Sequence, residues 1–143
     1  MMRDEEEVRA ASGRFYEALT QLCRGDPAAM EDAWHHTVGV STVHPFGEWS
    51  YGWEQVWATW QEIAQNARDG TVIGRHIEVS VHGTIAYTTG VEEVSVSYGK
   101  TVARWSANVT NVFSKTGGEW KMIHHHSDKA PAAEEAVEKL AES

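Results

Sequence analysis

The spacing of hydrophobic residues along this chain changes from a helical period to a strand period near residue 71. Over residues 4–24, apolar side chains recur every three or four positions and acids crowd the first turn, which predicts a helix. Asp26 and Pro27 have the residue types of a helix start, and they predict a short second helix that ends near residue 34. The same apolar spacing predicts a third helix, which begins at residue 50 or 52 and ends near residue 67.

Beyond the third helix, apolar and polar residues alternate, which is typical of half-buried β-strands. The alternation and the intervening turns predict four strands, at residues 71–82, 85–98, 101–115 and 119–127. A short strand or extended segment is predicted at residues 37–44, and the tail at residues 131–143 is either a frayed helix or disordered. Helices followed by an antiparallel meander predict one α+β domain over residues 1–143, with the helices on one face of a curved sheet.

The register of these strands can be predicted by keeping apolar side chains together on one face. A two-residue turn between the second and third long strands places Val94 opposite Trp105. The register that best pairs apolar residues at the next turn places Phe113 opposite Met122. A slip of one residue would place Lys121 against Phe113, which is less compatible with a buried face.

The last strand contains three consecutive histidines, and the register decides which face each one takes. Extending the pairing places Asn111 opposite His124 and Val109 opposite His126. Because side chains alternate between the faces of a strand, His124 and His126 are predicted on the helix-covered face beside Asn111, and His125 on the outer face. The covered face is predicted to carry Val94, Val96, Tyr98, Trp105, Ala107, Val109, Asn111, Phe113, Met122, His124 and His126.

Two inward histidines suggest acid/base chemistry, because imidazole titrates near neutral pH and burial shifts its pKa. Alternatively, the two histidines have a structural role, in which each ring forms hydrogen bonds with Asn111, a backbone carbonyl or water. A metal site is a further alternative, since imidazole pairs bind zinc or nickel. The middle histidine points away, so a third ligand would have to come from elsewhere, such as His44 or Glu48.

Seven tryptophans are many for 143 residues, and such a set often lines a pocket or forms a core. Trp49 and Trp53 lie near the turn at His44 and Pro45, so they are predicted as pocket walls together with Trp105. Trp57 and Trp60, on the apolar stripe of the third helix, are predicted as core. Tyr16 and Tyr87 could supply hydroxyl groups inside the fold.

Charge and composition exclude several functions. A formal net charge of −9 argues against a nucleic acid or an anionic membrane as the partner. No apolar run approaches the ~20 residues of a membrane span, and the acidic N-terminus lacks an export signal. The single Cys23 cannot form an internal disulfide, which fits a cytoplasmic location.

The helix and strand order, together with the closing sequence around Trp120, Ile123, His124, His126 and Asp128, resembles the nuclear transport factor 2-like superfamily. Its SnoaL-like branch is the nearer resemblance, and the association domain of calcium/calmodulin-dependent kinase II ends similarly. The segment from Thr110 to Phe113 also matches, and the resemblance spans roughly residues 5–130.

This resemblance implies a cone in which a strongly bent sheet wraps against helices and encloses a pocket. Members include polyketide cyclases, ketosteroid-type isomerases, dehydratases, ligand binders and assembly modules, so fold alone does not specify function. Some members have arginine where Asn111 stands here, and the difference argues against carboxylate binding at this position.

The first functional hypothesis is cofactor-independent acid/base chemistry (cyclisation, isomerisation or dehydration) on an apolar or aromatic carbonyl compound, with no metal. His126 and His124 are the candidate catalytic residues. The candidate substrate-binding residues are Asn111, Trp105, Trp53, Trp49, His44 and Met122. The second hypothesis is a non-catalytic ligand carrier or assembly module, whose pocket is filled by its own Trp side chains. A homodimer is expected through the outer sheet face, at Arg104, Ser106, Asn108, Thr110, Ile123 and His125.

Overall fold

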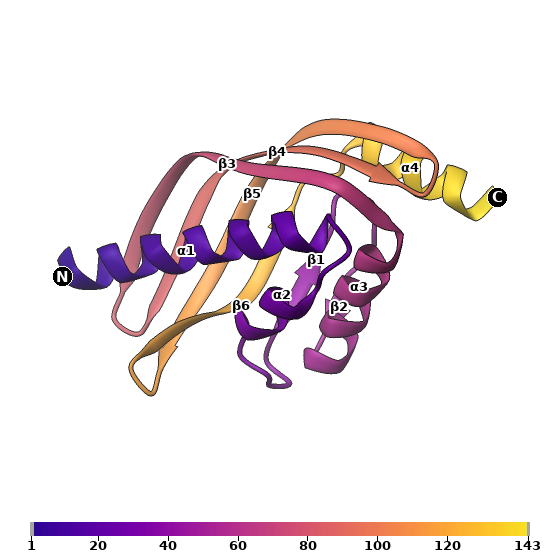
Figure 1. Ribbon diagram of the computed structural model, residues 1–143. Coiled ribbons are helices and arrows are strands. Elements are labelled where there is room, and N and C mark those ends of the chain that lie inside the picture. The colour runs from indigo at the N-terminus through magenta and orange to yellow at the C-terminus, as the bar shows by residue number, and fades with distance from the viewer. Residues whose placement is uncertain (1, 143) are drawn as a thin grey trace.

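A computed structural model describes residues 2–142 of the chain. Four helices and six strands follow one another in this order. They are α1 (Met2–Leu22), α2 (Ala28–Asp32), β1 (Ser41–Val43), β2 (Ser50–Tyr51), α3 (Trp53–Asn66), β3 (Ala67–His82), β4 (Ile85–Tyr98), β5 (Thr101–Thr116), β6 (Glu119–Ser127) and α4 (Pro131–Glu142). Figure 1 shows α1 lying across one face of the sheet, with α3 below its end and α4 at the far end of the long strands. The predicted α+β fold is confirmed.

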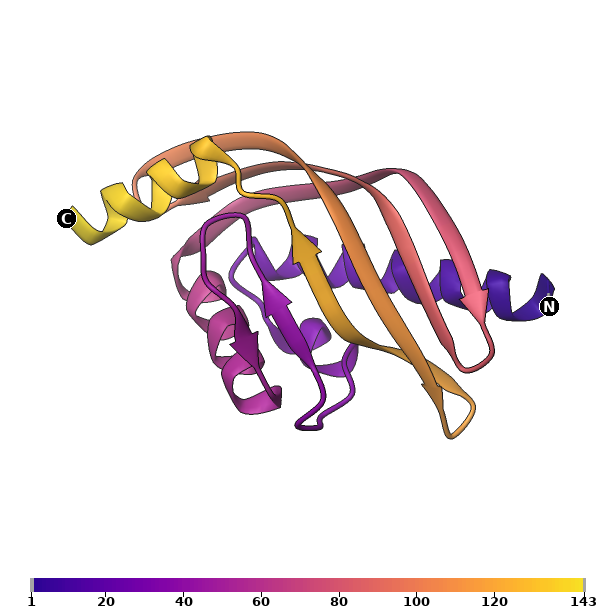
Figure 2. The ribbon, with the colours of Figure 1, turned by 180° about the vertical axis from the view of Figure 1, so that it is seen from behind.

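All six strands form one sheet in the order β2-β1-β6-β5-β4-β3. The neighbours are antiparallel except for β1, which runs parallel to β6. The predicted pairing of Val94 with Trp105 is confirmed, and so is the pairing of Phe113 with Met122. Seen from behind in Figure 2, the long strands bend together, and their outer face lies in front of α1.

Irregularities in β3 help to bend the sheet. The pairing with β4 shifts between Arg68 and Thr71 and again between Arg75 and Glu78, and bulges of this kind bend and twist a strand. At the second shift, a Cβ on Gly90 would lie 2.5 Å from Ile77 Cδ1 and 2.9 Å from the Arg75 carbonyl oxygen. Glycine at position 90 therefore allows β3 and β4 to approach closely at the bend.

The predicted register of β6 is wrong beyond Met122. The pairing with β5 shifts by one residue between Phe113 and Val112, so Ile123 is an extra residue in the ladder. Asn111 consequently pairs with His125 instead of His124. This bulge inverts every later side chain of the strand, because strand side chains alternate with a period of two.

The core lies between the concave face of the sheet and the helices. The apolar stripe of α1 buries Val8, Phe15 and Leu22 completely, and α3 adds Trp60 at 1% exposure. The small α4 residues Ala133 and Ala136 are also buried, where this helix closes the end of the cone. No helix within residues 2–142 is both long enough and apolar enough to cross a membrane.

Candidate functional site

A small cavity of about 50 Å³ lies inside the cone, between α3, α4 and the concave face of the sheet. Its wall is mostly apolar, but it contains polar side chains from separate elements. The polar and aromatic lining residues are Cys23, His44, Phe46, Trp60, Glu92, Tyr98, Trp105 and His125. Three α4 residues, Ala133, Ala136 and Val137, complete the wall, so α4 covers one side of the cavity.

His125 is held in this wall by a buried chain of hydrogen bonds. Its Nδ1 lies 2.6 Å from Asn111 Oδ1, and Asn111 Nδ2 donates to Tyr16 Oη at 3.4 Å. Because the Asn111 amide nitrogen is used as a donor, its oxygen must accept from Nδ1–H of His125. This tautomer leaves the lone pair on Nε2, an atom that makes no hydrogen bond within residues 2–142.

His44 is fixed in a similar way. Its Nε2 lies 3.0 Å from Thr59 Oγ1, while that hydroxyl donates to the Val56 carbonyl oxygen at 2.8 Å. The hydroxyl hydrogen is therefore used, so His44 donates from Nε2–H and keeps its lone pair on Nδ1. Burial lowers the pKa of His44 to about 4, and burial followed by the nearby His44 lowers the pKa of His125 well below its usual value. Both rings are neutral acceptors at pH 7, with centroids 6.1 Å apart.

Glu92 contributes a carboxyl group to the same cavity. It is 3% exposed, and its Oε2 has no protein hydrogen-bond partner within the described chain. Burial raises the pKa of Glu92 to about 7, and the neighbouring hydroxyls of Tyr16 and then Ser127 offset part of that rise. The carboxyl group is therefore divided between its charged and neutral forms near neutral pH.

Small residues on either side make room for this arrangement. Glu92 pairs with Gly74 on β3 and with Ala107 on β5. The Tyr16 ring from α1 packs directly on Gly74, where a Cβ would lie only 2.8 Å from Tyr16 Cε2. Gly74 therefore allows the tyrosine to reach both Asn111 and Glu92.

Gly74→Ala is expected to destabilise the protein by about 1–3 kcal/mol, because the added methyl group displaces the Tyr16 ring. Gly13→Ala is the matched control, since it lies in α1 with no atom within 4 Å of the new methyl group. That change should be neutral or stabilise by about 0.5–1 kcal/mol. Urea denaturation of both variants measures the difference. Equal stability of the two variants would contradict the proposed contact.

The structure places some of the predicted site residues at the cavity and others away from it. His44 and Trp105 line the cavity, and Asn111 supports it from behind with 0% exposure. Met122 is completely buried but pairs with Trp34 and is not part of the cavity wall. Trp53 lies outside the wall as well, stacked between His36 and Trp57 with ring centroids 4.1 Å and 5.5 Å away.

The predicted orientation of the three histidines is wrong, because of the extra residue Ile123. His125, predicted to face outward at a dimer interface, is 2% exposed and faces the cavity. His124 and His126 lie on the opposite face, where Trp49 stacks on His124 at 5.8 Å and meets the edge of His126 at 5.1 Å. Trp49 is 49% exposed and therefore lies outside the cavity.

Sequence reasoning missed Glu92 and the contribution of Trp60 to the cavity. The signal for Glu92 was available, because residues 92, 94 and 96 share one face of β4 and the last two are buried valines. A carboxylate in such a series is unusual unless it has a partner or a function. The helical spacing of Trp60 predicts a core residue, but this side chain also lines the cavity, and its Nε1 has no hydrogen-bond partner within residues 2–142.

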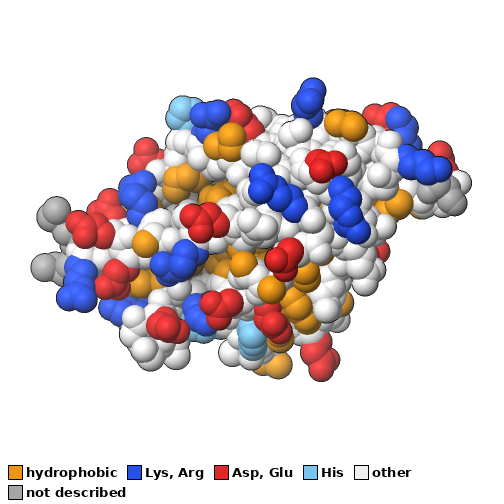
Figure 3. Space-filling view, viewed as in Figure 1, with side chains coloured by type: hydrophobic (Ala, Val, Ile, Leu, Met, Phe, Trp, Pro, Cys, Tyr) orange, Lys and Arg blue, Asp and Glu red, His pale blue; other side chains and the backbone are white. Residues whose placement is uncertain are grey.

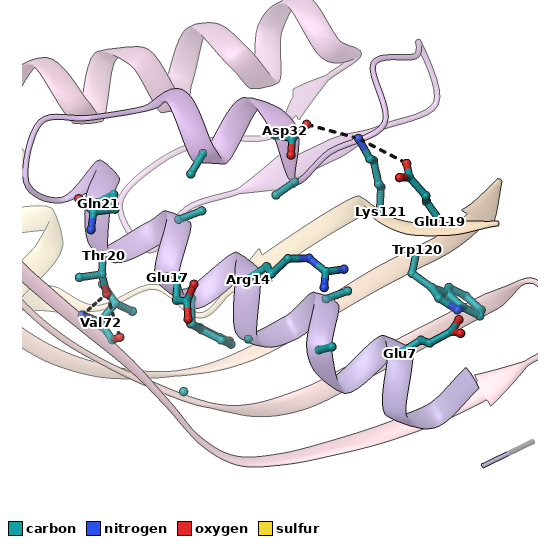
Figure 4. A pocket seen from close by; sticks show the side chains of 18 of the residues that line it. Glu7, Arg14, Glu17, Thr20, Gln21, Asp32, Val72, Glu119, Trp120 and Lys121 are labelled. Carbon is teal, nitrogen blue, oxygen red and sulfur yellow. Dashed lines mark hydrogen bonds and ion pairs between the residues drawn. The ribbon is translucent and has the colours of Figure 1, made fainter. Parts of the chain in front are cut away.

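A larger depression of about 1020 Å³ lies on the surface around α1. Figure 4 shows its rim, where Lys121 forms ion pairs of 3.7 Å with Asp32 and 3.9 Å with Glu119. Acidic and basic side chains are interspersed over this side of the molecule in Figure 3. The depression is open to water and contains no buried polar cluster, so the interior cavity is the better candidate. Within residues 2–142, no group of three or more His, Cys, Asp and Glu side chains could hold a metal ion.

Comparisons with known proteins agree with the fold. A crystal structure from Streptomyces avermitilis, a proposed dehydratase of the NTF2-like family, has a TM-score of 0.78 and 28% identity, with 91% of this chain and 98% of that chain covered. A proposed scytalone dehydratase from Novosphingobium aromaticivorans has a TM-score of 0.74 and 12% identity, over 88% of this chain and 83% of that chain.

Among curated proteins, the F-box protein SKIP8 of Arabidopsis thaliana is 29% identical over 100 residues, which are 69% of this chain. The matched part is only 40% of the length of that relative. The sequence model of the SnoaL-like domain matches residues 8–132, which include most of α1, all of α2 and α3, and all six strands. The predicted superfamily is therefore confirmed, and this chain belongs to the SnoaL-like domain family.

Proposed function

We propose that the chain is a cofactor-independent enzyme that performs acid/base chemistry on a small carbonyl compound inside the cone, with dehydration as the favoured reaction. The observation that carries this proposal is the chain His125–Asn111–Tyr16, which fixes His125 as a neutral hydrogen-bond acceptor at the cavity wall. A merely structural core would be more stable with apolar residues at these positions, since buried polar groups are costly.

The cavity offers both kinds of hydrogen-bonding partner that a hydroxy-carbonyl compound needs. The free ring nitrogens of His125 and His44 are acceptors for a substrate hydroxyl group. The indole N–H groups of Trp60 and Trp105 have no hydrogen-bond partner within residues 2–142 and are donors for a carbonyl oxygen. The remaining wall is apolar and suits a hydrocarbon or aromatic body.

Similarity to the Streptomyces protein supports dehydration over cyclisation and isomerisation. Its name gives the reaction class of that protein, and the level of 28% identity over almost the whole chain makes the same class the first to test here. A β-hydroxy ketone contains the hydroxyl group, the carbonyl group and the acidic α-hydrogen that such a reaction requires.

His125→Gln is expected to lower the turnover of a β-hydroxy ketone by about 100-fold or more, because the side chain that orients the hydroxyl group is lost. The probe is the aldol adduct of acetone and benzaldehyde, whose dehydration product absorbs in the near ultraviolet. His124→Gln and His126→Gln are matched controls on the same strand, and they should keep wild-type turnover because they face outward. Loss of turnover in these controls with retention in His125→Gln would reverse the assignment.

The second candidate function is a non-catalytic ligand carrier or assembly module, and the size of the cavity favours it. About 50 Å³ holds only a few water molecules, so a larger ligand requires α4 or the Trp side chains to move. In this case a homodimer would form through the outer face at Arg104, Ser106, Asn108 and Thr110, without the buried His125. Light scattering tests the dimer, and an inactive wild-type protein in the turnover assay would favour this candidate.

A further inference from the structure

We propose that Glu92 is the catalytic residue that moves the proton in this cavity, taking it from the α-carbon of a β-hydroxy carbonyl compound and returning it to the leaving hydroxyl group. This inference rests on the proposed function and names the group that performs its chemistry. Glu92 is the one carboxyl group among the described residues that lines the cavity, and it lies on β4 between Gly74 and Ala107.

The geometry of Glu92 is that of a poised reactive group. The residue is 3% exposed, and its Oε2 has no protein partner within residues 2–142 although it lies at the cavity wall. The hydroxyls of Tyr16 and Ser127 lie beside this carboxyl group and stabilise its charge, but a purely structural carboxylate at such a position would be expected to pair with a cation. Among the described residues, no Lys or Arg lines the cavity, so no basic side chain neutralises Glu92 there.

The histidines of the wall are less suited to remove a proton. Their donor nitrogens are bound to Asn111 and Thr59, and burial lowers the pKa of both rings, which makes them weak bases. Burial has the opposite effect on an acid, and a pKa of about 7 makes Glu92 the stronger base of the three. The titratable groups around it are Tyr16, Cys23, His44, Tyr98 and His125.

The reaction balances without a co-reactant. The ionised Glu92 takes the α-proton, and the enolate oxygen that forms accepts hydrogen bonds from the indole N–H groups of Trp60 and Trp105. Re-formation of the carbonyl group creates the carbon–carbon double bond and breaks the β-carbon–oxygen bond. The protonated Glu92 then gives its proton to the departing hydroxide, which leaves as water. The carboxylate is regenerated, and nothing is oxidised or reduced.

Glu92→Gln is expected to lower kcat for the acetone–benzaldehyde adduct by about 100-fold or more, with a much smaller change in KM. Glu92→Asp keeps a carboxyl group and should retain part of the activity. Glu93→Gln is the matched control, since its neighbouring carboxylate faces outward and pairs with Arg75 at 2.8 Å. The wild-type kcat should rise with pH around a midpoint near 7, because the ionised form of Glu92 starts the reaction.

Two results distinguish this inference from the proposed function. If Glu92→Gln keeps the turnover rate of the wild type while His125→Gln loses it, the role of Glu92 is overturned, but the cavity remains the site of the reaction. A wild-type protein with no turnover of the adduct would overturn both. Circular dichroism and the Tm of each variant establish that a loss of activity is not a loss of fold.

Discussion

Relative to that of the wild type, the free energy of unfolding of His44→Gln is expected to rise by about 3 kcal/mol between pH 7 and pH 4. Most of this change falls between pH 6.5 and pH 4. The histidine is 4% exposed, and burial lowers its pKa from 6.5 to about 4. Between these values the unfolded chain binds a proton that the folded chain does not. Stability contributed by neutral His44 is therefore present above pH 6.5 and is lost as the pH falls. Glutamine does not titrate, and its amide can still donate to Thr59.

Chemical denaturation at several pH values measures this difference. Below pH 4 the histidine is protonated in both states, so the difference between the variant and the wild type should level off. A difference that stays constant from pH 7 to pH 4 would contradict the burial of a neutral His44.

Glu92→Gln provides the control because its linkage has the opposite sign. The folded pKa of Glu92 is raised from 4.5 to about 7, so the folded chain keeps a proton that the unfolded chain releases. That contribution is complete below pH 4.5 and is lost as the pH rises to 7. The Glu92→Gln variant should thus gain stability relative to the wild type with increasing pH. In the wild-type protein, the opposite pH dependences of stability from His44 and Glu92 partly cancel.

The strands could be predicted from the sequence because they depend on local pattern. Residues 85–98 and 119–127 have a period of two between clear turns, and both strands occupy the predicted residues. The pairing of Val94 with Trp105 follows from the length of one tight turn, which is also local information. These features need no knowledge of distant contacts.

The bulge at Ile123 could not be predicted in this way. Met122 and Ile123 are adjacent apolar residues, and strict alternation allows only one of them on the covered face. In the structure both pack against the core, which is possible because the ladder shifts between them. Three identical residues follow, so the sequence offered no polarity difference that could reveal which histidine is inside.

The composition of the cavity depends on packing between elements that are far apart in the chain. Tyr16, Asn111 and His125 form one hydrogen-bonded chain although they come from α1, β5 and β6. Glu92 could have been noticed from its position on the same side of β4 as two valines. That Tyr16 lies beside it depends on Gly74, and this contact requires the three-dimensional arrangement of α1 and β3.

Trp60→Ala is expected to cost about 3–5 kcal/mol of the free energy of unfolding. The side chain is 1% exposed and lies between α1 and the site, with ring centroids 6.3 Å from Phe15, 4.4 Å from His44 and 5.6 Å from His125. Removing the indole leaves a void that these rings cannot fill without moving. Trp49→Ala is the control, since this ring is 49% exposed and its loss should cost about 1 kcal/mol or less.

The void left by Trp60→Ala also connects stability to the site. It would enlarge a cavity of about 50 Å³ by most of an indole, and apolar cavities of such size bind small aromatic molecules. Adding indole should therefore raise the Tm of Trp60→Ala more than that of the wild type or of Trp49→Ala, since a ligand that binds only the folded state stabilises it. Equal Tm shifts in all three proteins would mean that the surrounding side chains move to fill the void at position 60. The cavity wall would then be more adaptable than the packing of Trp60 against His44 and His125 implies.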